Sequence, residues 1–370
     1  MKRTMGILFA DNDDSHLKEL TLNRTSASVP FGGRYRLIDF ELSNFANANV
    51  TKIGILTRNN YNSLMDHIRM GRDWDLNRKN SGLSIYPPFV FNTSHDVYKG
   101  KVEALYTLKG FISKSEEEYV LISDTDIAIN IDFDDVEKFH LSKGADITML
   151  TYKTDEFTAK KIILKEDKNK RIVDMRLPVS TDTSKQLCDL NIYFLKKSLL
   201  LSLIDKAYAY GEYNFEKDVI HKNLEELYVM SYEVKDYVAV IDSVESYFKH
   251  SMDLLDLDTR ESLFYKNSTI YTKVKDSVPT RYKEGANVKN SIIADGCEID
   301  GTVENSILFR SVKVGKGAVI KNSIIMEKSI IMDDAKLDYT ITDKNVIIEK
   351  GRQLSGYATY PIVIAKSKRI

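Results

Sequence analysis

Two aspartates stand where a buried strand is expected to end, with a spacing that suits a metal site. The apolar run 119–122 is followed by Ser-Asp-Thr-Asp, which places carboxylates at Asp124 and Asp126. Carboxylates at the tip of a central strand commonly hold a divalent cation beside substrate phosphates. An Asp-x-Asp pair is equally typical of a turn or a helix cap, and further acids follow at Asp132, Asp134 and Asp135. The pattern therefore leaves a cation site and the start of a helix as alternatives.

A strand, loop, helix and strand at the start of the chain are expected to position this edge of the sheet. Short apolar runs at 5–9 and 52–56 are typical of buried parallel strands, and apolar residues recur near helical spacing over 37–50. The loop 10–33 is much longer than the usual connection between a strand and its helix. Because it leaves the carboxyl end of the first strand, where ligands bind in open α/β sheets, it is expected to line a binding site.

The remaining apolar patterns up to about residue 257 complete one α/β domain. They predict helices at 61–68, 102–112, 199–207 and 244–255, and strands at 119–122, 147–152, 161–165 and 191–195. Segment 153–236 is expected to add antiparallel strands and a lid to the sheet. The irregular stretch 71–100, which holds the single tryptophan Trp74, is typical of a binding loop or an interface.

Short self-similar phrases replace this pattern after Lys283. Asn-Ser-Ile-Ile or a close variant starts at Asn290, Asn305, Asn322 and Lys328. Repeats of this short period predict a parallel β-helix of about four coils, in which each strand turns one aliphatic residue inward. The inward columns are expected from Ile292 or Ile293, Ile307 or Leu308, Ile324 or Ile325, and Ile330 or Ile331. No histidine follows His250, so the base of a hexapeptide acyltransferase is missing and a structural or regulatory role is favoured.

Composition narrows the class of protein. The 53 lysines and arginines are interspersed with 54 acids, which argues against nucleic-acid and membrane-surface partners. Cys188 and Cys297 lie far apart without metal-ligand spacing and are expected to be structural thiols in a reducing compartment. The apolar run 5–10 is too short for a signal peptide, and no segment reaches about eighteen apolar residues. We therefore expect a soluble cytoplasmic protein.

A series of motifs extends over the whole chain. They are Pro30-Phe-Gly-Gly-Arg-Tyr-Arg with Ile38-Asp-Phe-Glu-Leu-Ser-Asn, Trp74-Asp-Leu with Pro87-Pro, Tyr98-Lys-Gly, Lys217-Asp-Val-Ile, and Glu245-Ser with Met252-Asp-Leu-Leu. Together with the terminal β-helix they resemble the glucose-1-phosphate adenylyltransferase family of sugar nucleotidyltransferases. The resemblance implies an α/β fold, with a Rossmann-like nucleotidyltransferase domain of mixed, mostly parallel sheet at 1–257, a linker at 258–282 and a left-handed parallel β-helix at 283–370. It also implies a tetrameric enzyme that joins ATP and glucose 1-phosphate to give ADP-glucose and pyrophosphate, with Mg²⁺ held by two aspartates.

The phosphate loop of that family is altered in this chain. Active members carry a glycine-rich loop with an arginine directly after the first strand, whereas this chain has Asp11-Asn-Asp-Asp-Ser-His. Glycine permits backbone amides to approach phosphates closely, and carboxylates carry the wrong charge for a polyphosphate. At roughly 5 Å and an effective dielectric constant of about 20, each carboxylate opposes a phosphate charge by about 3 kcal/mol before screening. Productive binding of ATP is therefore not expected in this loop.

The positions that the resemblance assigns to catalysis and to the metal are altered as well. A lysine expected shortly before the Pro-Phe-Gly-Gly motif corresponds to Ser26. The first metal aspartate is retained as Asp126, whereas the second corresponds to Val240, which cannot bind Mg²⁺. Asp242 lies two residues further on, which in a strand moves a ligand by about 7 Å. The resemblance therefore implies that no metal is held by this chain.

The sugar-phosphate pocket of the family is also reduced. A glutamate-lysine-proline segment that binds the phosphate corresponds to Arg176-Leu-Pro, and a pocket glycine corresponds to Asn191. A relic of this pocket is expected at Tyr193, Lys217 and Asp218.

A retained fold with altered catalytic groups resembles the regulatory subunits of this family, which pair with a separate catalytic subunit. The first hypothesis is a weakly active or inactive subunit that stabilises or activates a catalytic glucose-1-phosphate adenylyltransferase subunit in a heterotetramer, through its β-helix. Such a chain requires no cofactor of its own, since Mg²⁺ serves the partner's reaction, and it could also form a homo-oligomer. The alternatives are an adenylyltransferase active in its own right, and a module that senses a sugar phosphate or nucleotide through Tyr193, Lys217 and Asp218.

Overall fold

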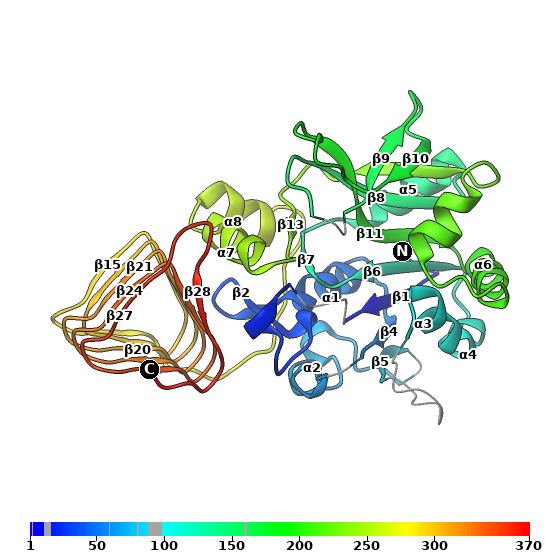
Figure 1. Cartoon of the computed structure of the whole chain (residues 1–370). Helices are drawn as coiled ribbons and strands as arrows, with labels where there is room; N and C mark the ends of the chain where they lie inside the picture. Colours follow the sequence, from blue (N-terminus) through cyan, green and yellow to red (C-terminus); the bar gives the residue numbers. More distant parts are fainter. Residues whose placement is uncertain (2, 11–15, 59, 80, 88–97, 159–160) are drawn as a thin grey trace.

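The computed structural model describes residues 1, 3–10, 16–58, 60–79, 81–87, 98–158 and 161–370, so nearly all of the acidic loop expected to repel ATP lies outside the described residues. An α/β domain is followed by a three-sided solenoid at the carboxyl-terminal end (Figure 1). None of the helices within the described ranges is long and apolar enough to span a membrane, α6 (Lys197–Ala209) being the longest of them.

A nine-stranded mixed sheet forms the centre of the α/β domain. Strand β1 (Thr4–Phe9) pairs in parallel with β4 (Lys52–Leu56) and β6 (Tyr119–Asp124), as the apolar runs predicted. Strand β5 (Gly82–Tyr86) pairs in parallel with β4, within the stretch for which no strand was expected. The remaining strands of this sheet are β8 (Ile147–Thr154), β9 (Ile163–Glu166), β10 (Ile172–Arg176), β11 (Gln186–Lys196) and β12 (Val229–Glu233). Strand β11 runs antiparallel to β6, and β10 antiparallel to β9, so the fold is the predicted mixed α/β sheet.

Helices cover both faces of this sheet. Helix α1 (Leu37–Asn47) joins β1 to β4 and packs in one hydrophobic cluster with α2 (Asn62–Ile68) and α5 (Phe133–Lys143). Helices α3 (Lys101–Thr107), α4 (Lys109–Ser113) and α6 pack in a second cluster on the opposite face (Figure 1). The helix expected at 102–112 is divided at Leu108 into α3 and α4. The other helices are α7 (Val244–Asp253) and α8 (Leu257–Phe264).

The acids after Asp126 form the start of α5. Asp132 is the N-cap of this helix, and its Oδ1 accepts a hydrogen bond of 2.8 Å from the backbone N–H of Asp134. A side-chain oxygen at this position satisfies an N–H that has no partner within the helix. For Asp132, the structure therefore shows the helix cap.

The solenoid is built from three parallel five-stranded sheets, so it has five coils and not the four that were expected. One short strand of each coil enters each sheet. The first sheet contains β14 (Arg281–Tyr282), β17 (Glu298–Ile299), β20 (Lys313–Val314), β23 (Ile330–Ile331) and β26 (Ile347–Ile348). The second contains β15 (Asn287–Lys289), β18 (Thr302–Glu304), β21 (Val319–Lys321), β24 (Lys336–Asp338) and β27 (Gln353–Ser355). The third contains β16 (Ile292–Ile293), β19 (Ile307–Leu308), β22 (Ile324–Ile325), β25 (Thr340–Thr342) and β28 (Ile362–Ile364).

Three of the four repeated phrases stack on one another in the third sheet. Ile293 pairs with Leu308 and Leu308 with Ile325, and all three pack into the interior of the solenoid. The fourth phrase does not join this column, because Ile331 pairs with Val314 on the first sheet. A repeated phrase thus identifies the inward residue but not the side of the coil that carries it.

The asparagines of these phrases stand at the corners of the coils. Asn290, Asn305 and Asn322 have φ angles of 43°, 48° and 45°, in the left-handed region that asparagine tolerates better than most residues. The amide of Asn290 donates a hydrogen bond of 2.8 Å to Oδ1 of Asn305. In the next position, Ser291 Oγ accepts from the N–H of Ser306 at 3.1 Å. The Asn-Ser repeat therefore follows from the backbone conformation at each corner.

One face of the solenoid packs against the α/β domain. Ile307, Ile324 and Ile341 are fully buried in the same hydrophobic cluster as Phe31 and Phe40. The linker expected at 258–282 begins within α8, whose Phe264 ring lies 4.8 Å from the ring of Tyr35. The two domains thus share a core, and the solenoid contributes to the packing of the domain that precedes it.

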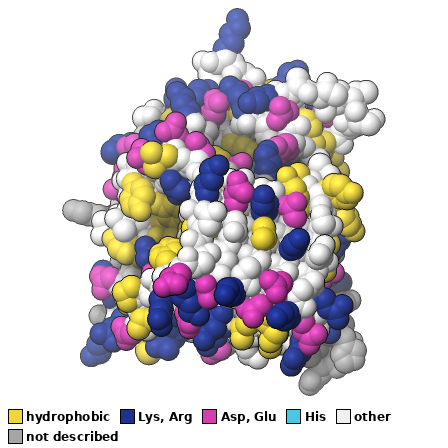
Figure 2. Space-filling view, turned by 90° about the vertical axis from the view of Figure 1, so that its left-hand side faces the viewer, with side chains coloured by type: hydrophobic (Ala, Val, Ile, Leu, Met, Phe, Trp, Pro, Cys, Tyr) yellow, Lys and Arg dark blue, Asp and Glu magenta, His cyan; other side chains and the backbone are white. Residues whose placement is uncertain are grey.

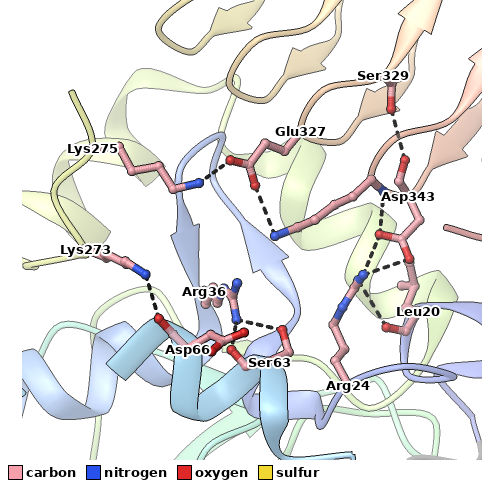
Figure 3. A network of polar contacts seen from close by, with 11 residues as sticks. Leu20, Arg24, Arg36, Ser63, Asp66, Lys273, Lys275, Glu327, Ser329 and Asp343 are labelled. Atoms are coloured by element: carbon pink, nitrogen blue, oxygen red, sulfur yellow. Dashed lines mark hydrogen bonds and ion pairs between the residues drawn. The ribbon is translucent and has the colours of Figure 1, made fainter. Parts of the chain in front are cut away.

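Ion pairs reinforce this contact between the domains (Figure 3). Nη2 of Arg24 lies 2.8 and 2.9 Å from the two carboxylate oxygens of Asp343, and both side chains are buried. Glu327 pairs with Lys275 and with Lys344, the latter at 3.2 Å. Residues more than 300 positions apart are therefore joined by an ion pair shielded from water, in which one arginine nitrogen contacts both carboxylate oxygens.

Candidate functional site

A cavity of about 120 Å³ lies at the carboxyl end of β6. Its lining includes Leu17, Asp124, Asp126, Tyr152, Lys161, Asp189, Asn191, Val240 and Asp242. This is the edge at which open α/β sheets bind ligands. Pockets that enclose drug-sized ligands measure roughly 300–1,000 Å³. The cavity between the described residues is therefore small for a nucleotide together with a sugar phosphate.

The two positions expected to hold a metal lie side by side at this cavity. Val240, in β13 (Ala239–Val240), pairs with Ile127 in β7 (Ile127–Ala128), and the N–H of Ile241 donates to the backbone oxygen of Asp126 at 2.7 Å. Of this pair only Asp126 offers a carboxylate. Within the described ranges, no group of three or more His, Cys, Asp or Glu residues could hold a metal ion. The residues at the expected pair therefore do not fit Mg²⁺, which prefers oxygen ligands in octahedral geometry.

Asp242, two residues beyond Val240, faces the same cavity. Its Oδ2 accepts a hydrogen bond of 2.9 Å from Oγ1 of Thr158. The sequence predicted a carboxylate two residues away from the expected metal position. In the structure, this carboxylate also lines the cavity. One of its oxygens is already engaged by a neighbouring hydroxyl.

A buried polar network lies directly beside the cavity and centres on Tyr193. The hydroxyl of Tyr193 donates to Oδ2 of Asp189 at 2.5 Å and lies 3.3 Å from Oε1 of Glu216. Burial raises the pKa of Asp189 to about 7, and the hydrogen bond from Tyr193 lowers it only in part. Glu216 also accepts from Nζ of Lys101 at 2.6 Å, and Asp124 from the same nitrogen at 3.0 Å. Two strands, a helix and the turn at 215–220 thus bring one ammonium into contact with two carboxyl groups, and Tyr193 connects a third to them.

The residues expected to accompany Tyr193 lie elsewhere. Lys217 is exposed, and Asp218 accepts a hydrogen bond of 3.0 Å from the N–H of Asn214 and lines a separate cavity beside α6. Their neighbour Glu216 is the residue of this segment that reaches Tyr193. The segment is a π-helical turn, Phe215–Ile220, which places the side chain of Glu216 inward. The sequence motif thus located the segment but not the residue that contacts Tyr193.

Two further positions were expected in the sugar-phosphate pocket. Asn191 lies at the cavity, whereas Arg176 does not. Asn191 has a φ of 54° at a register shift of β11 and lines the cavity, which agrees with its correspondence to a glycine. Arg176 instead forms an exposed pair with Asp182 at 2.7 Å, and Leu177 is 61% exposed. Ser26 is buried in a 3₁₀ turn, Ser26–Ser28, and does not line the cavity.

Lys101 and Glu216 were not singled out from the sequence. Lys101 directly follows the Tyr98-Lys-Gly motif, and Glu216 directly precedes the Lys217-Asp-Val-Ile motif. A lysine and a glutamate 115 positions apart carry no periodic signal that links them. Only the order of the strands brings their segments together at the end of β6.

Glu41 is a fully buried acid on α1, behind this edge of the sheet. Burial, together with the nearby carboxyls of Asp124 and Asp126, raises the pKa of Glu41 from its ordinary 4.5 to about 8. The folded protein therefore keeps a proton on Glu41 between about pH 4.5 and 8 that the unfolded chain releases. Its contribution to stability is lost as the pH rises through this window.

We expect Glu41→Gln to remove this pH dependence. The amide cannot ionise, so the variant should gain about 2–4 kcal/mol relative to the unsubstituted protein between pH 5 and pH 8. Urea unfolding at both pH values measures the gain. Glu284→Gln, at an exposed position of the first coil, is the control and should show no such change. Equal effects of the two substitutions at pH 5 and pH 8 would contradict a buried, protonated Glu41.

A second cavity, of about 90 Å³, lies between the two domains. Its charged lining consists of Arg34, Arg36, Lys273, Lys275, Arg310 and Lys344 with Asp66 and Glu327. Nη1 of Arg36 donates to the backbone oxygen of Ser63 at 2.6 Å, and Nζ of Lys273 to that of Asp66 at 2.6 Å (Figure 3). Much of the basic charge in this cavity is therefore engaged by groups of the chain itself.

Comparison with known proteins covers nearly the entire chain. Residues 6–257 match the family model described as nucleotidyl transferase, and residues 275–357 match the one described as GlmU-like, C-terminal hexapeptide. The chain is 35% identical to glycogen biosynthesis protein GlgD of Bacillus subtilis, over 98% of this chain and 95% of that protein. It is 39% identical to glycogen biosynthesis protein GlgD of Geobacillus stearothermophilus, over 86% and 83% of the two chains. Identity to the glucose-1-phosphate adenylyltransferase of the same organism is 32%, over 86% and 84%.

Proposed function

The chain belongs to the nucleotidyl transferase family, in the group formed by glycogen biosynthesis protein GlgD and the glucose-1-phosphate adenylyltransferases, and we propose that it is the regulatory subunit of such an enzyme. Its role lies in glycogen biosynthesis. The proposed partner is a catalytic glucose-1-phosphate adenylyltransferase subunit, which makes ADP-glucose and pyrophosphate from ATP and glucose 1-phosphate. In a heterotetramer this chain stabilises or activates that subunit and needs no cofactor of its own.

The observation that carries this proposal is the aliphatic side chain of Val240 at the wall of the cavity. It stands beside Asp126, where the resemblance requires a second carboxylate. An aliphatic group neither binds a metal nor stabilises the charge that develops during phosphoryl transfer. The chain keeps the fold of the enzyme although this carboxylate is lost. We explain the retained fold by the binding of a partner subunit.

The solenoid offers two sides for such a partner, since its third sheet faces the α/β domain. Basic and acidic side chains are interspersed over the solenoid (Figure 2), and pairs such as Glu298 with Lys313, at 3.0 Å, join successive coils. Exposed apolar side chains lie directly before and in the first coil, where Val274, Val278 and Tyr282 are 74%, 73% and 55% exposed, and on the last coil at Tyr357 and Tyr360. Strand β14 pairs with β17 alone among the described strands, so its other edge is open. Open edges and exposed apolar groups favour association, and we place the partner contact there.

Substitution at the first coil of the full-length chain tests this contact. Val278→Asp combined with Tyr282→Asp should weaken association with the catalytic subunit at least about tenfold, because two charges are placed in a desolvated interface. Pull-down and stimulation of ADP-glucose formation are measured at equal concentrations. Tyr357→Asp, on the last coil and 75% exposed, is the matched control and should leave both unchanged.

Point substitutions are preferred to removal of the solenoid. Truncation after Thr280 would expose Phe31 and Phe40, which share a core with the solenoid. Undiminished association and stimulation by the double variant would move the contact away from the first coil.

An adenylyltransferase active in its own right is the second candidate. Asp242 favours it, because this carboxylate faces the same cavity as Asp126. Under this candidate, the isolated chain makes ADP-glucose and Asp242→Asn abolishes the activity. Under the first candidate, the same substitution leaves stimulation of the catalytic subunit unchanged.

A further inference from the structure

Lys101 is a partly buried cation, its side chain 18% exposed, that is held by carboxylates from two other elements. It begins α3, and its Nζ lies 3.0 Å from Oδ2 of Asp124 on β6 and 2.6 Å from Oε1 of Glu216 in the π-helical turn. The rings of Phe9 and Tyr193 flank the ammonium, with centroids 5.6 and 5.9 Å from Nζ. The cation is therefore surrounded by carboxylate oxygens and aromatic faces.

The carboxyl groups around Lys101 outnumber it. Asp124 and Glu216 both contact the one ammonium, and Asp189 joins the network only through the hydroxyl of Tyr193. Oδ1 of Asp124, a residue only 3% exposed, has no hydrogen-bond partner among the residues described, although Asp124 lines the cavity. A buried carboxylate oxygen with unused acceptor capacity beside a cavity is a further ligand position.

We propose that the carboxylates of Asp124 and Glu216 form a cation site that the chain fills with its own lysine, and that removal of the ammonium opens the site to a hydrated divalent cation. The site is separate from the expected metal pair at Asp126 and Val240. Oxygen ligands from carboxylates suit Mg²⁺, Mn²⁺ and Ca²⁺, and two buried carboxylates that share one ammonium favour a second positive charge, with water completing the coordination. In the intact protein, the tethered ammonium occupies this place without a loss of translational entropy and excludes the ion.

The electrostatics of Lys101 agree with this arrangement. Burial lowers the pKa of the Lys101 ammonium, but the attraction of Asp124 and Glu216 outweighs burial and raises the pKa above its ordinary value. The lysine thus stays charged at neutral pH. Removing one partner of a buried ion pair leaves the other charges uncompensated, which is the driving force for capture of an external cation.

Binding of Mn²⁺ to the full-length Lys101→Met variant tests the inference. The variant should bind one Mn²⁺ at least about tenfold more tightly than the unsubstituted chain, measured as loss of the free-ion signal in electron paramagnetic resonance. Lys101→Arg, which keeps the cation, should show no gain. Lys109→Met is the matched control, because Lys109 forms a pair of 2.7 Å with Asp205 on the exposed surface near α3. The double substitution Lys101→Met with Glu216→Gln should lose the gain.

Two results would overturn the inference: a folded Lys101→Met variant that binds Mn²⁺ no better than the unsubstituted chain, and a gain that survives Glu216→Gln. If the variant unfolds without metal, Mn²⁺ should restore its folding, as measured by circular dichroism, and failure to do so also counts against the site. The measurement uses the isolated chain and no partner, so its outcome is independent of the proposed regulatory function.

Discussion

Replacing Arg24 by alanine is expected to lower the free energy of unfolding by about 3–5 kcal/mol, because it leaves a buried carboxylate without its partner. Arg24 and Asp343 are 3% and 1% exposed, and their ion pair joins the α/β domain to the last coils of the solenoid. Oδ1 of Asp343 also accepts from the N–H of Lys344 at 2.6 Å, which fixes the carboxylate in place. The carboxylate cannot turn to solvent when the arginine is removed, so the full cost of an unpaired charge is expected.

Urea unfolding of the full-length chain measures this loss. The matched control is Arg369→Ala, whose pair with Glu349 at 2.9 Å is solvent-exposed and should contribute about 1 kcal/mol or less. The double variant Arg24→Met with Asp343→Leu should recover most of the stability, since apolar groups of similar size often replace a buried ion pair without loss. A loss from Arg24→Ala no larger than that of the control would show that the pair does not hold the domains together.

Local patterns predicted the elements that carry the site. The apolar runs 5–9 and 52–56 became β1 and β4, and the repeated Asn-Ser phrases became the corners of the solenoid. These features could be predicted because each depends on burial or backbone conformation within a few residues. Strand β5 was missed because it is only five residues long and lies within an irregular stretch of the sequence.

Contacts between distant segments could not be predicted in this way. The fifth coil was missed because its strands, Ile347–Ile348, Gln353–Ser355 and Ile362–Ile364, do not carry the Asn-Ser-Ile-Ile phrase. The pairing of Lys101 with Glu216 depends on the order of the strands, and the burial of Glu41 depends on how α1 packs on the sheet. The family motifs identified the two segments that form the Lys101 network. The charged residues themselves, Lys101 and Glu216, each lie one residue outside a motif.

Purified in isolation, the chain is expected to form ADP-glucose at least about a thousandfold more slowly than a catalytic member of its family. Removing a single group that stabilises charge in a transition state commonly costs 10²–10³ in rate, on the order of 3–4 kcal/mol. Here the second carboxylate is replaced by Val240, and Lys101 adds a fixed charge beside Asp124. Groups that act as a unit are not additive, so the deficit is not the product of the single losses.

The most direct test of the regulatory role is the initial rate of ADP-glucose formation by the purified chain. The protein is produced in a host that lacks its own glucose-1-phosphate adenylyltransferase and is measured alone and mixed with the catalytic subunit. We predict a rate near background for the chain alone, and a mixture that is faster than the catalytic subunit by itself. Robust turnover by the isolated chain, abolished by Asp242→Asn, would contradict the regulatory role and establish an active enzyme.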